Sequence, residues 1–164
     1  MAAVYVFALP QVDIAASHDV LIDSNPSSET FVITNKSWYP LWDVRPFVGV
    51  CEIQIQFGNP DTARDKTLSK PLGKCDGSLY NRRVGGNKWN KRSLGIGEQY
   101  PIALSDAIWI WMPVPSYSIS IIVQYRPWFI PCTLTKETKY ETRELADGNL
   151  HWFPNGDYHS LHCF

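Results

Sequence analysis

The residues best suited to binding chemistry lie in one basic stretch, 82–92, which reads RRVGGNKWNKR. It holds five positive charges, one tryptophan and no acidic residue. Such a segment could grip phosphate groups on lipids, on lipopolysaccharide or on nucleic acid, with the indole stacking or entering an interface. It could equally be a solvated hairpin whose charges keep a sheet edge soluble, which is the favoured interpretation. The candidate binding residues here are Arg82, Arg83, Lys88, Trp89, Lys91 and Arg92.

Three further tryptophans are candidates for a binding surface. Trp109 and Trp111 alternate with aliphatic residues, and Trp128 follows somewhat later in the chain. Exposed rings would form a shelf for sugar rings or a partner protein. If their strand is central, at least one of these rings packs in the core instead.

Residues for catalysis or metal binding are present, but no motif organises them. No G-x-S-x-G turn presents a serine, so we predict no catalytic residue and no enzyme activity. A metal needs ligands in fixed geometry, and the metal-capable residues near the C-terminus are expected in a tail. We therefore predict no metal site and no cofactor. The metal-capable residues are His151, Asp157, His159, His162 and Cys163.

The four cysteines show no C-x-x-C spacing, which argues against a zinc or redox motif. An oxidising compartment would permit disulfides, and Cys51 with Cys75 is the pair to test first. Buried or idle thiols are the alternative. Cys163, one residue from the end, is the cysteine least expected to be structural.

The sequence pattern is that of strands, and the 12 prolines and 10 glycines argue against long helices. Residues 117–125 alternate most clearly, with apolar side chains at odd positions, as in a half-buried antiparallel strand. In residues 41–57, Trp42 and Val44 share one face, whereas later apolar residues have the opposite parity. A change of parity requires a bend, which we place at Pro46 or Gly49.

Further strands are expected at 19–23, 29–35, 99–104, 107–112 and 150–154, and residues 133–144 are expected to form a solvated outer strand. The chain is thus predicted to be all-β, an immunoglobulin-like antiparallel β-sandwich of seven or eight strands. The sandwich is assigned to residues 11–154 and a C-terminal tail to 155–164. The apolar segment 1–10 is either an edge strand or the remnant of a membrane anchor.

Two stretches resemble known bacterial domains. Residues 31–37 with 40–44 match the F-x-I-T-N-x-S … P-L-x-D-V opening of surface-exposed, adhesion-related immunoglobulin-like domains. Residues 125–129 with 147–154 are similar to a group of small bacterial membrane-anchored proteins of unknown function. In that group, one transmembrane helix precedes a single periplasmic domain. The resemblance runs from about Pro10 to Pro154, whereas the Cys pair flanking a tryptophan in antibody domains is missing.

The resemblance implies an immunoglobulin-like fold on the periplasmic or extracellular side of a membrane, anchored by an N-terminal helix that is missing from this chain. It implies no activity. We therefore expect a non-catalytic, membrane-tethered interaction module that binds another envelope or surface protein. The alternatives are a module that binds glycans or anionic lipids and, third, an enzyme with an unrecognised site. With a net charge of −1, nucleic acid is an unlikely partner.

Overall fold

The computed structural model describes residues 10–18, 28–57, 66–71, 90–106, 116–129 and 131–163. These residues form nine strands and one short 3-10 turn, Leu104–Asp106, and no helix among them is long and apolar enough to cross a membrane. The strands are β1 (Val12–Ala16), β2 (Thr30–Asn35), β3 (Leu41–Phe57), β4 (Lys66–Pro71), β5 (Lys91–Leu94), β6 (Gln99–Ala103), β7 (Ser116–Pro127), β8 (Cys132–Glu144) and β9 (Leu150–Cys163).

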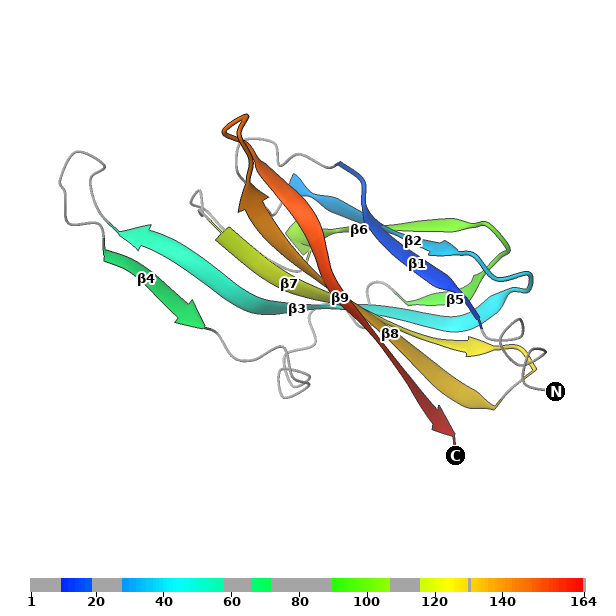
Figure 1. Ribbon diagram of the computed structural model, residues 1–164. Helices are drawn as coiled ribbons and strands as arrows, with labels where there is room; N and C mark the ends of the chain where they lie inside the picture. Colours follow the sequence, from blue (N-terminus) through cyan, green and yellow to red (C-terminus); the bar gives the residue numbers. More distant parts are fainter. Residues whose placement is uncertain are drawn as a thin grey trace.

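The strands form two antiparallel sheets (Figure 1). The smaller sheet has the order β1-β2-β6, and the larger has the order β4-β3-β7-β8-β9, with β5 also paired to β3. In immunoglobulin terms these are the A-B-E order and the C′-C-F-G order, with β9 added beyond the G position. The predicted all-β, immunoglobulin-like sandwich is therefore confirmed, with nine strands among the described residues where seven or eight were expected.

Apolar side chains from both sheets meet in one core. The odd-numbered residues of β7, from Tyr117 to Tyr125, are buried, as the alternating pattern predicted. Phe31 of β2 faces them and packs against Trp152 of β9, with ring centroids 5.5 Å apart. The larger buried members are Phe31, Ile33, Leu41, Ile102, Ile119, Ile121, Tyr125 and Trp152.

Strand β3 bends, but not where the sequence suggested. Its register against β7 shifts between Trp42 and Arg45 and again between Val50 and Glu52, and Asp43 has a positive φ of 54°. Aspartate tolerates this left-handed conformation better than most residues. The bulge therefore turns Trp42 outward while Val44 is fully buried, so the expectation that they share a face was wrong.

Pro46 needs no bend because it lies between the parts of β3 that pair with β5 and with β4. There, among the described strands, β3 has only β7 as a neighbour. A proline, which lacks an N–H, is tolerated in such a one-sided stretch.

Strands β8 and β9 correct two further expectations. β8 is not a solvated outer strand, because it lies between β7 and β9 and buries Thr135, Lys136, Glu137 and Thr138. Residues 155–163 are not a tail: β9 continues to Cys163 and pairs with β8 to its end, with one register shift near Thr138. The strands expected at 19–23 and 107–112, and the segment 1–9, lie outside the described residues.

Candidate binding surface at the aromatic end

One end of the sandwich carries exposed aromatic side chains on two turns and the start of β3. We call this surface the aromatic end and define it by Trp38, Trp42, Trp128 and Phe129. Their exposed fractions are 69, 43, 66 and 40 %, respectively. Single exposed apolar residues are common on proteins, whereas groups of large exposed aromatic rings are typical of interaction surfaces.

Ring contacts connect the two turns of the aromatic end. Tyr39 is buried between them and meets Trp38 at 5.1 Å and Phe129 at 4.9 Å, each edge to face. Phe129 in turn meets Trp128 at 5.7 Å. Edge-to-face contacts of this kind hold rings in defined orientations. Burial raises the pKa of Tyr39 to about 12, so its hydroxyl stays neutral at physiological pH.

Asn35, the last residue of β2, fixes the turn that carries Trp38. Its side-chain amide is fully buried and donates to the carbonyls of Tyr39 (2.9 Å) and Leu94 (3.0 Å). Its Oδ1 accepts the backbone N–H of Ser37 at 2.9 Å, an asparagine turn of the common local type. One side chain therefore connects the β2–β3 turn to the end of β5.

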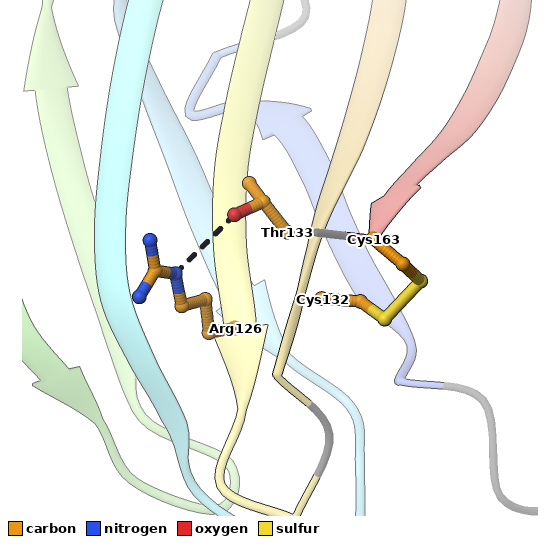
Figure 2. The surroundings of a disulfide bond; sticks show 4 residues. All are labelled: Arg126, Cys132, Thr133 and Cys163. Carbon is orange, nitrogen blue, oxygen red and sulfur yellow. Dashed lines mark hydrogen bonds between the residues drawn. A yellow bond between two sulfur atoms is a disulfide. The ribbon is translucent and has the colours of Figure 1, made fainter.

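A disulfide fixes the second turn from the other side. Cys132 opens β8 directly after the turn with Trp128 and Phe129, and it is bonded to Cys163 at the end of β9. Figure 2 shows this disulfide next to Arg126, whose Nε donates to Thr133 Oγ1 at 3.2 Å. Two links therefore hold the strands next to this turn. The Arg126–Thr133 hydrogen bond joins β7 to β8, and the disulfide joins β8 to β9.

Charged groups lie beside the exposed rings. Arg126 is opposite Trp42 in the register of β3 and β7, and its Nε lies 3.8 Å from Asp43 Oδ2. Arg45 binds the same carboxylate through Nε and Nη2, at 3.0 and 2.8 Å. Two guanidinium groups thus share one carboxylate, and both remain about half exposed. The aromatic end is consequently bordered by a local excess of positive charge.

The structure brings together only some of the predicted binding residues. Trp128 is exposed in the aromatic end, and Arg92 is exposed on β5 next to Ser93, which is opposite Trp42. Lys91 instead pairs with Glu98 and lies 5.3 Å from the centre of the Tyr100 ring, a structural role. Arg82, Arg83, Lys88, Trp89, Trp109 and Trp111 lie outside the described residues.

The cysteine predictions have two outcomes. Cys163, the cysteine least expected to be structural, forms a disulfide, because β9 extends further than predicted and brings it opposite Cys132. The predicted partner of Cys51, Cys75, lies outside the described residues, so that pairing stays a prediction.

Trp38, Trp42 and Phe129 were not selected from the sequence. Trp38 and Phe129 occupy turns, where no alternation marks a side chain as inward or outward, and the bulge at Asp43 breaks the alternation at Trp42. A usable signal was present nonetheless: both turns combine large aromatics with serine or proline, so neither reads as a strand.

One group of hydrolase-type residues does occur, at the end of β1. Glu29 is buried, and its carboxylate accepts from Ser17 Oγ (2.8 Å) and from the backbone N–H groups of His18 and Thr30. Ser17 Oγ also lies 3.0 Å from His18 Nδ1. In a catalytic triad the histidine stands between serine and carboxylate, whereas here the serine contacts both. The arrangement thus fits a cap on the chain that leaves β1.

Comparison with known proteins gives no relative: no family model, no curated protein and no solved structure matches this chain.

Proposed function

We propose that this protein is a non-catalytic binding module that uses the aromatic end to hold a partner protein. The observation that carries the proposal is the group of four exposed large aromatics, three on turns fixed by Asn35 and by a disulfide and one at the start of β3. Turns that are already ordered lose little entropy when a partner binds.

The place of the aromatic end in the fold supports the same function. The β2–β3 and β7–β8 turns correspond to the B–C and F–G loops, which form part of the antigen-binding end of antibody variable domains. Tryptophan and arginine are also the residues most enriched among energetically dominant contacts in protein interfaces. A protein partner with an apolar centre and acidic border would match this surface.

We further propose that the module works outside the cytosol. Disulfides form and persist in oxidising compartments, and the Cys132–Cys163 bond supports such a location. The membrane tether and the envelope setting are carried over from the sequence resemblance.

A glycan or an anionic lipid is the alternative partner. The exposed Trp128 lies two residues from the half-exposed Arg126, the combination of ring and cation that such ligands require. The test below therefore includes both classes.

The experiment places a photo-crosslinking amino acid at position 38, at position 128 or, as a control, at the exposed position 158 on β9. We expect one adduct of defined mass from positions 38 and 128 but not from 158. The adduct should be lost in the double variant Trp42→Ala, Phe129→Ala. If the protein is retained on anionic liposomes or envelope polysaccharide at low salt and forms no protein adduct, the partner protein is rejected and the glycan or lipid ligand is supported.

A further inference from the structure

A cavity of about 330 Å³ lies between the two sheets, open on one side to solvent and separate from the aromatic end. β1, which pairs with β2 alone among the described strands, forms one wall, and β8 and β9 form the other. Small-molecule sites usually measure about 300–1,000 Å³, so this cavity has room for one small ligand. Its polar and aromatic lining comes from Asp13, Lys136, Thr138, Tyr140, Trp152 and Asp157.

Lys136 places a charge inside this cavity. Its residue is only 8 % exposed, and its Nζ donates to the Val12 carbonyl at 2.8 Å. Asp157 Oδ2 lies 3.5 Å from the same nitrogen. An ammonium group has three N–H donors. These two contacts therefore leave one donor of Lys136 for a further acceptor.

Two other lining residues hold polar atoms that have no partner. Thr138 Oγ1 and Trp152 Nε1 are buried without a hydrogen bond. Buried polar atoms without a partner are few in proteins, and each one calls for a physical explanation. Both atoms are covered by neighbouring groups, although their residues line the cavity.

We propose that this cavity binds a small neutral polyhydroxylated ligand, of the size of one sugar residue. Lys136 supplies a donor, Asp13 and Asp157 supply acceptors, and the Thr138 hydroxyl turns to the ligand about χ1. A sugar hydroxyl donates and accepts, so it satisfies both sets. The two carboxylates disfavour an anion, and the buried ammonium of Lys136 disfavours a cation. Tyr140 and Trp152 add the aromatic surface against which the C–H face of a sugar packs.

This ligand site does not depend on the proposed partner protein, because it shares no residue with the aromatic end. Loss of one site therefore leaves the other intact, and the two proposals can fail separately.

The test is a two-dimensional ¹H–¹⁵N NMR titration of the intact protein with D-glucose, D-galactose and N-acetyl-D-glucosamine. The Trp152 indole N–H signal is assigned with the variant Trp152→Phe. We expect a saturable shift of that signal and of the Thr138 amide with at least one of the three sugars. Sodium acetate, sodium phosphate and ammonium chloride should give no saturable shift.

Variants then locate the site. Thr138→Val keeps the side-chain shape and removes an unpaired hydroxyl, so the fold should be kept while the affinity falls about tenfold, the effect of one lost hydrogen bond. Tyr158→Ala, on the opposite face of β9, should bind as the parent does. The proposal is overturned if no sugar shifts the Trp152 indole, if acetate or phosphate saturates the shift instead, or if Thr138→Val binds unchanged.

Discussion

Cys132 and Cys163 lie directly opposite each other at the free ends of β8 and β9, and their disulfide closes this strand pair beside the turn that carries Trp128. The bond spans 31 residues of sequence, so one covalent link holds the whole β8–β9 hairpin. The same bond therefore holds the end of β9 in place and restrains the turn of the aromatic end that precedes β8.

The double variant Cys132→Ser, Cys163→Ser should lower the free energy of unfolding by about 3–4 kcal/mol, the entropic value for a loop of this length. Denaturant unfolding of parent and variant measures the difference. Reductant should destabilise the parent by at least this amount, whereas any effect of reductant on the variant would report the predicted Cys51–Cys75 pair. Equal unfolding midpoints for oxidised parent and variant would show that the hairpin is held by its backbone hydrogen bonds alone.

Ile121→Ala should cost about 2–5 kcal/mol, because the side chain is fully buried between the two sheets and its loss leaves a cavity. Tyr158→Ala is the matched control, since that ring is 57 % exposed on β9 and should change stability by less than about 0.5 kcal/mol. Thermal and denaturant unfolding provide the measurement. Similar effects at the two positions would contradict the described core.

Asn35→Ala should cost at least about 2 kcal/mol, because it leaves the buried carbonyls of Tyr39 and Leu94 without their donor. It should also loosen the β2–β3 turn, observed as faster hydrogen exchange at Ser37 and Trp38. Lys36→Ala, on the exposed neighbouring residue, serves as the control. An unchanged rate of hydrogen exchange at Ser37 would show that the Asn35 side chain does not order the turn.

The β8–β9 turn should make a pH-dependent contribution to stability. Hydrogen bonds from the Asn149 side chain, the Asn149 backbone N–H and His151 lower the pKa of Asp147 to about 2. A folded-state pKa below the unfolded value stabilises the fold above about pH 4, and this contribution is lost as the pH falls toward 2. Asp147→Asn should therefore unfold with a weaker pH dependence between pH 4 and 2. A parallel pH profile for both proteins would contradict the predicted linkage.

The sequence predicted strands well where side chains alternate strictly, as in β7, because burial of one face leaves that period in the residue types. β8 was predicted wrongly because its buried polar residues have partners on the neighbouring strand β7 and on β1 of the other sheet. Glu137 accepts from Ser120 Oγ at 2.6 Å, and Lys136 donates to the Val12 carbonyl. From composition alone, such charged and polar residues are expected to be exposed to solvent.

The last strand was predicted too short for a different reason. Pro154 to Asp157 has the composition of a turn. In the fold a shift in register and the positive φ of Gly156 (111°) absorb these residues within β9. The aromatic end could not be predicted either, because Trp38 and Trp128 are 90 positions apart in the chain and are connected through Tyr39 and Phe129 in the fold.

The outer edge of β1 has acceptors that are already engaged. The carbonyls of Val12 and Ile14 take hydrogen bonds from the side chains of Lys136 and Tyr140, which reach across from the other sheet. A strand from a neighbouring molecule that approached this edge would find those oxygens occupied. Even at high concentration, copies of the protein would therefore resist edge-to-edge strand pairing along β1, and the domain would stay out of fibrils.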